Sequence, residues 1–397
     1  MTEPARKLRV AHVATVDLSL RYLLLNQMLY LQREGYEVTG ISAPGPDVPF
    51  IEGRGIPHIA VPMTRSMTPL ADAKALADLV RIFRARRFDI VHTHTPKPGL
   101  IGQLAARIAG VPMIVNTIHG FYFHERMKPR SRAFFITMER IAALQSHAIL
   151  SQSAEDVETA VRERICRREA IQLLGNGIDL ARFNPAAKSE PERAAERERL
   201  GIPRGATVIG FVGRLVEEKG IPELFEAFRG VLRAHPEARL LVVGPTDESK
   251  ADALRPERAA AYGIADACVF PGFRTDVEAM YAVMDVFVLP SHREGFPRAV
   301  MEASAMGKPV VATDIRGCRE AVVHERSGLL VPVKDPTALG AALDRLLRDP
   351  ELRARLGAGA VEVARERFDE QRVFRTVKET YERLARRRPL AEAGRRP

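Results

Sequence analysis

The stretch that decides the fold runs Val286-Phe-Val-Leu-Pro-Ser-His-Arg-Glu294-Gly-Phe-Pro-Arg-Ala-Val-Met-Glu302. Its apolar start is typical of a buried strand, and its second half continues as a helix. Glu294 is therefore expected in the loop beyond the carboxyl end of a strand, and Glu302 in the first turns of the next helix. In open α/β sheets ligands bind at this edge, where helix starts offer free N–H groups to phosphates and hydroxyl-rich ligands.

A second signal lies upstream, in Val212-Gly-Arg214-Leu-Val-Glu-Glu-Lys219-Gly. A strand predicted at 207–213 ends in a glycine turn, and two cations follow it, five positions apart. An arginine fork and a lysine point charge at such an edge suit one diphosphate. Either motif alone is more often a set of solvated surface side chains than a binding site. Both together, at strand ends of one half-chain, favour a phosphate-binding site.

Apolar strands alternate with longer helical stretches along the chain, which predicts parallel sheets with helices on both faces. A turn-rich, charged segment at 183–191 separates two series of such units, and we place the domain boundary there. With 397 residues, 46% of them hydrophobic, the chain can build two packed cores. The strands are expected at 8–14, 37–42, 59–62, 90–94, 113–118, 148–151 and 171–174, and then at 207–213, 240–243, 268–271, 286–289, 310–312 and 328–331.

The composition excludes several classes of protein. A net charge of +10 favours anionic partners, whether phosphates, nucleic acid or acidic lipid headgroups, and composition alone does not choose among them. No stretch approaches the roughly 20 apolar residues that span a bilayer, and the N-terminus has no signal-peptide core, so a cytoplasmic protein is expected. The cysteines are three in number and unclustered, which argues against a disulfide framework and a zinc site.

These motifs resemble family 4 of the retaining glycosyltransferases, which use nucleotide sugars. The resemblance also includes Phe270-Pro-Gly-Phe, the run from Glu302 to Thr313 and the segment Gly175-Asn-Gly-Ile-Asp-Leu-Ala-Arg-Phe183. It covers essentially residues 7–385 and is strongest in the second half. It implies an α/β architecture of the GT-B type, with two facing Rossmann-like domains and a C-terminal helix that crosses back to the first domain.

With this architecture the chain divides into four parts. We expect a Rossmann-like acceptor domain at 1–184 and a Rossmann-like nucleotide-sugar donor domain at 185–367. A helix at 368–385 would return to the first domain, and residues 386–397, rich in arginine, would form a disordered tail.

The resemblance assigns most of the donor site to the second domain. Arg214 and Lys219 would hold the diphosphate and stabilise its charge as the sugar leaves. Glu302 would accept hydrogen bonds from the ribose hydroxyls, because a carboxylate offers two oxygens to a vicinal diol. Glu294 would lie beside the donor sugar. The other donor-binding residues expected are Gly295, Phe296 and Arg298, through backbone N–H groups, and Phe273 and Arg274, beside the base.

The first domain contributes a histidine in Asn116-Thr-Ile-His119-Gly-Phe121, just past a predicted strand. A lone histidine is often structural, but a position at a strand end followed by glycine favours function. By resemblance His119 contacts the donor sugar. The predicted catalytic residues are therefore Glu294, His119, Arg214 and Lys219.

Acceptor recognition is assigned to two loops of the first domain. The polar residues after the strand at 90–94 either recognise the acceptor or serve only to form the loop. The loop at 14–20 lacks the glycines with which many relatives approach the donor phosphate, so that role is not carried over. Its Asp17 and Ser19 either cap the following helix or touch the acceptor. The acceptor-binding residues expected are Asp17, Ser19, His94, Thr95 and Lys97.

Neither a metal nor a cofactor is expected. The chain has no Asp-x-Asp, and Arg214 and Lys219 supply the countercharge that a metal would otherwise provide. Alternation places His92 and His94 on the same side of a strand, but no third ligand is evident beside them. The nucleotide sugar is itself a substrate. By resemblance the anomeric configuration is retained, by same-face attack assisted by the leaving phosphate.

Two other functions remain open. A nucleotide-sugar epimerase or a phosphorylase uses the same architecture, although the pyridoxal-binding lysine of a phosphorylase is not evident here. A non-catalytic nucleotide-sugar- or polyanion-binding protein is the other alternative, and the intact charged motifs weigh against it. Nucleic acid is not an expected partner.

A segment at 126–140 combines basic and apolar residues, which suits an anionic membrane surface. Packing of its apolar side chains into the core is the alternative. Lipid-linked acceptors are frequent in the resembling family, so we expect a glycan or lipid-linked acceptor, assembly of a surface polysaccharide or glycolipid, and peripheral contact with the inner face of the plasma membrane. The residues concerned are Arg126, Lys128, Arg130, Arg132, Phe134, Phe135, Ile136 and Met138.

Overall fold

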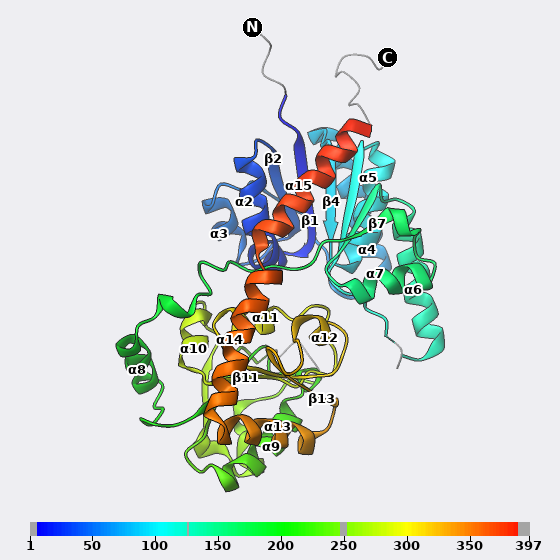
Figure 1. The fold of residues 1–397 in the computed structure, drawn as a ribbon. Helices are drawn as coiled ribbons and strands as arrows, with labels where there is room; N and C mark the ends of the chain where they lie inside the picture. The colour runs from blue at the N-terminus through cyan, green and yellow to red at the C-terminus, as the bar shows by residue number, and fades with distance from the viewer. Residues whose placement is uncertain (1–5, 125–126, 247–251, 388–397) are drawn as a thin grey trace, which may run out of the picture. The chain divides into compact units, whose positions relative to one another are not determined.

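The computed structural model describes residues 6–124, 127–246 and 252–387, which form two compact units (Figure 1). The first unit contains the described residues up to Gly175 and from Gln371 onward, and the second runs from Asn176 to Glu370. Each unit is built on one parallel sheet. This confirms the predicted class of two Rossmann-like α/β domains.

The first sheet has the strand order β3-β2-β1-β4-β5-β6-β7, and all neighbouring strands are parallel. The order reverses between β1 and β4, which makes the carboxyl end of this pair the switch point at which such sheets bind ligands. The strands are β1 (Arg9–Val16), β2 (Glu37–Ala43), β3 (His58–Ala60), β4 (Ile90–His94), β5 (Met113–Ile118), β6 (Ala148–Ser151) and β7 (Ile171–Leu173).

Helices cover both faces of this sheet. One face packs against α2 and the C-terminal helix α15, and the other against α4 and α5. Helices α6 and α7 pack beside β5, β6 and β7. The helical elements are α1 (Asp17–Ser19), the π-helical turn η1 (Leu20–Leu24), α2 (Leu25–Arg33), α3 (Val48–Gly53), α4 (Pro69–Arg86), the π-helical turn η2 (Pro98–Gly102), α5 (Gln103–Ala109), α6 (Pro129–Ala143), α7 (Ala154–Arg162) and α15 (Glu370–Arg387).

The second sheet repeats the plan, with the order β10-β9-β8-β11-β12-β13 and parallel pairing throughout. Its switch point lies between β8 and β11. The strands are β8 (Val208–Val212), β9 (Arg239–Val243), β10 (Cys268–Gly272), β11 (Val286–Leu289), β12 (Val310–Thr313) and β13 (Gly328–Val331).

One large apolar core joins this second sheet to its helices. Side-chain caps begin several of the helices: Asp335 and Asp349 each accept a backbone N–H of the first turn, and Ser189 forms a capping box with Glu192. The helices are α8 (Glu190–Arg199), α9 (Ile221–Ala234), α10 (Val277–Val283), α11 (Arg298–Ala305), α12 (Cys318–Ala321), α13 (Pro336–Arg348) and α14 (Pro350–Arg367), with a short 3₁₀ turn η5 (Glu217–Lys219) before α9.

The boundary between the units lies nine residues earlier than the one expected after residue 184. Ile178 and Phe183 are buried in the second core, and the Ile178 N–H donates to the Phe368 carbonyl oxygen at 2.9 Å. The returning helix, expected at 368–385, is α15, whose apolar side chains pack into the first unit. Arg386 and Arg387 end this helix, and the rest of the expected tail lies outside the described residues.

Among the residues described, no helix combines the length and the apolar composition that crossing a bilayer requires.

Candidate functional site at the two switch points

The two charged motifs of the second unit meet at the carboxyl ends of β8 and β11. Lys219 Nζ lies 2.6 Å from Glu294 Oε1, and the Ser291 hydroxyl donates to the same oxygen at 2.7 Å. The side chains of Lys219 and Glu294 are only 19% and 11% exposed. A charge-assisted bond in such a partly desolvated position is stronger than the same pair on an open surface.

A glycine brings Lys219 to this position. Gly220 has φ +72°, is the N-cap of α9, and has no room for a side chain, because a Cβ would collide with the Pro290 carbonyl oxygen. The chain therefore turns directly against the end of β11. From there Lys219 reaches the loop that carries Glu294.

Glu302 lies in α11, and its carboxylate is held by two donors. The Tyr281 hydroxyl donates to Oε2 at 3.0 Å, and Arg298 Nε, one turn earlier, donates to Oε1 at 2.9 Å. Burial, and then the charge of Glu302, raise the pKa of Tyr281 well above its ordinary value, so it remains a donor. A carboxylate has about four lone-pair positions, so acceptor capacity remains for a diol.

The loop between these carboxylates is fixed by its neighbours. The Thr313 hydroxyl donates to the Ser291 carbonyl oxygen at 2.5 Å, and the Phe296 ring packs edge-on against Phe368. Gly317, at φ +80°, lies so close that a Cβ would collide with the Gly295 carbonyl oxygen. The backbone of Gly295, Phe296 and Arg298 thus lies at the edge where the sequence predicted donor contacts.

The remaining second-unit residues are placed less simply. Arg214 follows β8 and is partly buried, and Phe273 is 58% exposed. Arg274 donates to Asp276 at 2.7 and 2.8 Å and to Glu196 at 3.2 Å. Its hydrogen bond to Asp276 raises the pKa of Arg274. To contact the base, Arg274 would have to give up hydrogen bonds to Asp276 or Glu196. The sequence motif gave no sign of these two partners.

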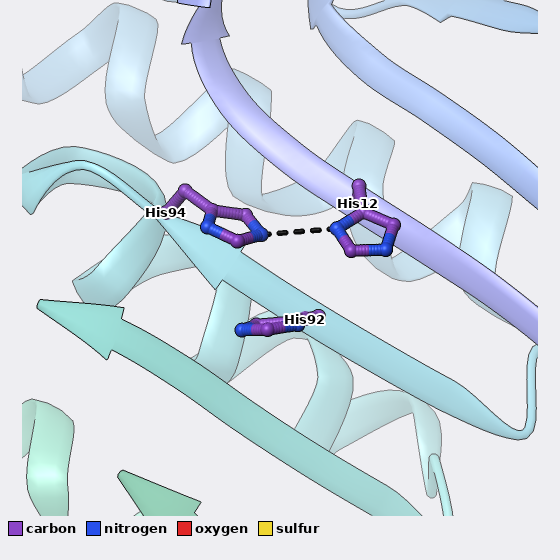
Figure 2. Close-up of side chains that lie close together, drawn as sticks. All are labelled: His12, His92 and His94. Carbon is purple, nitrogen blue, oxygen red and sulfur yellow. Dashed lines mark hydrogen bonds between the residues drawn. The ribbon is translucent and has the colours of Figure 1, made fainter. Parts of the chain in front are cut away.

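The first unit carries four histidines at its own switch point, and Figure 2 shows three of them, His12, His92 and His94. His12 of β1 is paired with His92 of β4 in the sheet register. His12 Nδ1 lies 3.0 Å from His94 Nε2, and His94 Nδ1 lies 3.1 Å from Nε2 of His119, which directly follows β5. His92 contacts the Tyr381 hydroxyl at 2.6 Å and the Thr117 hydroxyl at 2.7 Å.

The expectation that no third histidine accompanies His92 and His94 is wrong. His12 supplies it, because β1 and β4 are neighbours in space although 80 residues separate them in the chain. Metal-ligating atoms of the three rings lie within 4.8 Å of one another. Protein groups already engage both nitrogens of His92, and His12 and His94 engage each other. Among the described residues His12 Nε2 alone of these ring nitrogens on His12 and His92 has no partner, and the absence of a metal stays a prediction.

Burial keeps these histidines neutral. It lowers the pKa of His12 to about 3 and that of His119 to about 4, and it lowers the pKa values of His92 and His94 well below the ordinary value. Repulsion between neighbouring rings acts in the same direction on His92 and His94. At neutral pH each ring therefore has one N–H donor and one lone pair.

The residues expected to bind the acceptor have partners within the first unit. Lys97 Nζ donates to Asp72 Oδ1 and the Ser66 carbonyl oxygen, each at 2.5 Å, and to the Thr64 hydroxyl at 3.1 Å. It thereby fastens the segment before α4 to the end of β4. This contact set supports the loop-structure alternative for Lys97.

In the loop after β1, Asp17 accepts backbone N–H groups without acting as the N-cap of α1, and acceptor contact by Asp17 and Ser19 stays a prediction. Asp17 Oδ2 accepts the Asp47 N–H at 2.8 Å, and α1 begins without a side-chain cap. Asp17 therefore ties β1 to the loop after β2, and Ser19 is buried in α1. Thr95, at φ +69°, bonds the Thr15 hydroxyl at 2.9 Å across the switch point, a strained conformation of the kind that collects at functional sites.

Four residues of these two clusters were missed from the sequence: His12, Ser291, Tyr281 and Tyr381. Ser291 was within the quoted motif, three residues before Glu294, and its spacing was the available signal. The other three come from elements far along the chain and offer no local pattern.

Comparison with known proteins agrees with the two-unit division. The family described as Glycosyltransferase Family 4 matches residues 22–182, and the one described as Glycosyl transferases group 1 matches residues 192–363. The chain is 28% identical over 351 residues to the UDP-Gal:alpha-D-GlcNAc-diphosphoundecaprenol alpha-1,3-galactosyltransferase of Escherichia coli, covering 87% of this chain and 89% of that one. It is 34% identical over 316 residues to the D-inositol 3-phosphate glycosyltransferase of Xylanimonas cellulosilytica, covering 76% and 73%.

The fold is also that of solved glycosyltransferases. The crystal structure of HepE from Anabaena in complex with UDP-glucose superimposes with a TM-score of 0.79 at 21% identity, covering 95% of this chain and all of that one. Fold, motifs and relatives agree along both halves of the sequence. The chain belongs to glycosyltransferase family 4, a family of nucleotide-sugar-dependent glycosyltransferases with the GT-B fold.

Proposed function

We propose that this glycosyltransferase holds its nucleotide sugar at the switch point of the second unit and transfers the sugar with retention of configuration. The observation that carries the proposal is the cluster at the ends of β8 and β11, where Lys219, Glu294 and Ser291 form one hydrogen-bonded group. An ammonium has three N–H donors, so contact with Glu294 is compatible with bonds to phosphate oxygens. Lys219 and Arg214 stabilise the charge that develops on the leaving diphosphate.

The same cluster supports same-face attack. A covalent intermediate would need a carboxylate whose negative charge is available to attack the anomeric carbon. Glu294 Oε1 is shared by Lys219 and Ser291, and both oxygens of Glu302 accept hydrogen bonds. Carboxylates stabilised in this way are weaker nucleophiles, which favours assistance by the leaving phosphate.

The relatives narrow the substrates to test first. One of them is named for transfer from UDP-Gal to a diphosphoundecaprenol-linked sugar, and HepE was crystallised with UDP-glucose. We propose a UDP-sugar donor and a lipid-linked glycan acceptor for assembly of a surface polysaccharide or glycolipid. The relatives reported above give no support to the epimerase or binding-protein alternatives.

We expect transfer from a UDP-sugar to a lipid-diphosphate-linked sugar to proceed in excess EDTA and to yield an α-linked product from an α-linked donor. The paired cations supply the countercharge for the diphosphate, so no ion is needed there. Proton NMR of the product reports the configuration, and rates with and without the chelator report metal dependence. Activity that vanishes with EDTA and returns with Mg²⁺ or Mn²⁺, or a β-linked product, would contradict the proposal.

We propose that a surface on and beside α6 faces the membrane that holds the lipid-linked acceptor. This surface includes fewer of the residues at 126–140 than the sequence suggested. Ile136 is buried and Arg132 pairs with Glu163 at 2.7 Å, so neither is available to lipid. Arg126 lies outside the described residues. The exposed members of this surface are Lys128, Arg130, Tyr122, Phe134, Ile141 and Leu144, with Leu144 78% exposed.

We expect the protein to pellet with liposomes that contain anionic lipid, and less so at high salt. Exchange of Lys128 and Arg130 for glutamine should lower binding by roughly tenfold or more, since each cation near such a surface contributes about 1 kcal/mol. Arg229→Gln, on the exposed side of α9, is the matched control and should leave binding unchanged. Equal binding to neutral and anionic liposomes, or none at low salt, would refute this surface without affecting the glycosyltransferase assignment.

A further inference from the structure

We propose that His12 and His94 form a directional hydrogen-bond chain that fixes His119 as a neutral imidazole with its proton on Nδ1. His12 and His94 are then positioning residues, and His119 is the group that meets the substrate. The role of His119 in transfer rests on the proposed function, whereas its tautomer is a property of the free protein.

The series of hydrogen bonds from His12 through His94 to His119 is continuous, and its two inner rings are buried. His12 Nδ1 to His94 Nε2 is 3.0 Å, and His94 Nδ1 to His119 Nε2 is 3.1 Å. Figure 2 shows His12 and His94 directed toward each other from neighbouring strands β1 and β4. His12 is fully buried and His94 is 2% exposed, whereas His119 keeps partial exposure at the end of β5. Buried hydrogen bonds of this kind are strong and set orientation.

Neutral imidazoles allow only two directions along this chain. Each ring has one N–H and one bare nitrogen, so the protons all point toward His119 or all point away from it. Protonated rings would allow other patterns, but burial lowers the pKa of His12 to about 3 and that of His119 to about 4.

The far end of the chain selects the direction. His12 Nε2 is buried, and no described residue provides it with a hydrogen-bond partner. With the protons directed away from His119, Nε2 would carry an unpaired N–H. With the protons directed toward His119, Nε2 is a bare acceptor. Buried unpaired N–H groups are the rarer and costlier defect, so the second direction is favoured.

The direction of the hydrogen bonds determines which nitrogen of His119, at the end of β5, carries the proton. His94 Nδ1–H donates to His119 Nε2, so the proton of His119 must be on Nδ1. The Gln152 side chain forms a hydrogen bond that raises the pKa of His119, as a bond from a ring N–H to an amide oxygen does. His119 thus has a single N–H, on Nδ1, which Gln152 holds in place, and a hydroxyl or another neutral oxygen of the sugar would share or replace that bond.

The first test uses the wild-type protein without substrate. Long-range proton–nitrogen NMR on ¹⁵N-histidine-labelled protein distinguishes protonated from bare ring nitrogens, and the missing signal of His119→Asn assigns the resonance. We expect a protonated Nδ1 and a bare Nε2 on His119. A proton on Nε2 overturns the proposal, as does stoichiometric metal bound to the three-histidine cluster by elemental analysis.

Two variants of His12 test the direction of the chain. His12→Phe keeps a ring without a donor, whereas the amide nitrogen of His12→Asn takes the place of Nδ1–H. We expect the phenylalanine variant to show mixed tautomers of His119 and about tenfold slower transfer, the effect of one neutral hydrogen bond. The asparagine variant should keep mostly the wild-type tautomer of His119 and most of the wild-type rate of transfer. An unchanged His119 tautomer in a folded His12→Phe protein overturns the chain. If that variant does not fold, the wild-type spectrum still decides which nitrogen of His119 carries the proton. A wild-type protein that shows the expected spectrum but no transfer would refute only the proposed function.

Discussion

Exchange of Lys219 for methionine should lower transfer by about 30- to 1000-fold, which corresponds to about 2–4 kcal/mol of lost transition-state stabilisation. Lys219 combines direct charge with a fixed position, because Gly220 turns the chain against β11 and Glu294 holds the ammonium at 2.6 Å. Initial rates at saturating acceptor and varied nucleotide sugar measure the loss. Arg229→Met is the matched control, since its ion pair with Glu226 lies on the exposed side of α9.

A double variant separates a binding role from a structural one. Lys219→Met alone leaves the poorly exposed Glu294 carboxylate with an unneutralised charge, which should lower the free energy of unfolding by up to about 3 kcal/mol. Lys219→Met with Glu294→Gln removes both charges, so thermal stability should return while transfer stays low. Transfer that recovers together with the melting temperature would mean that Lys219 serves the fold and not the diphosphate.

The strands were largely predictable because a parallel sheet buries both faces of its inner strands. Such strands appear as short β-branched runs between turn residues. Strands β4, β5, β6, β11 and β13 have the predicted bounds, residue for residue. The ends of β1 were less predictable, since it continues past Ala14 to Val16 and leads directly into α1.

The domain boundary shows the limit of composition as a guide. The turn-rich segment at 183–191 marked a break in secondary structure, whereas the break in packing lies after Gly175. Ile178 and Phe183 belong to the second core. A chain can therefore join the second unit before its first strand begins, and turn residues do not show this.

Side-chain partners were the least predictable part of the site. The motifs placed Lys219 and Glu294 at strand ends, but their contact depends on β8 and β11 being neighbours across the switch point. His12 meets His94 through the same kind of crossover, and Tyr381 reaches His92 from 289 residues further along the chain. Local periodicity determines which face a residue occupies, and tertiary packing determines what lies opposite.

The second large effect is expected at Glu302, through the ribose. Glu302→Gln keeps the shape of the side chain but turns one acceptor oxygen into a donor amide, although Tyr281 and Arg298 both need acceptors there. We expect kcat/KM for the nucleotide sugar to fall by about 30- to 1000-fold, since a buried charged hydrogen bond and an orphaned donor are both involved. Tyr281→Phe keeps the carboxylate and removes one orienting bond, so it should cost only about 2- to 10-fold.

A donor with 2′-deoxyribose tests whether the carboxylate of Glu302 meets the ribose itself. In the wild-type enzyme the missing hydroxyl should lower kcat/KM, because Glu302 loses a donor. In Glu302→Gln the same deletion should cost little, because the interaction is already gone, and in Tyr281→Phe it should retain most of its cost. This is the logic of a double-mutant cycle with one change placed in the ligand. Equal penalties in wild type and Glu302→Gln would show that the two groups do not interact, and would leave Glu302 as a support for Tyr281 and Arg298 at the start of α11.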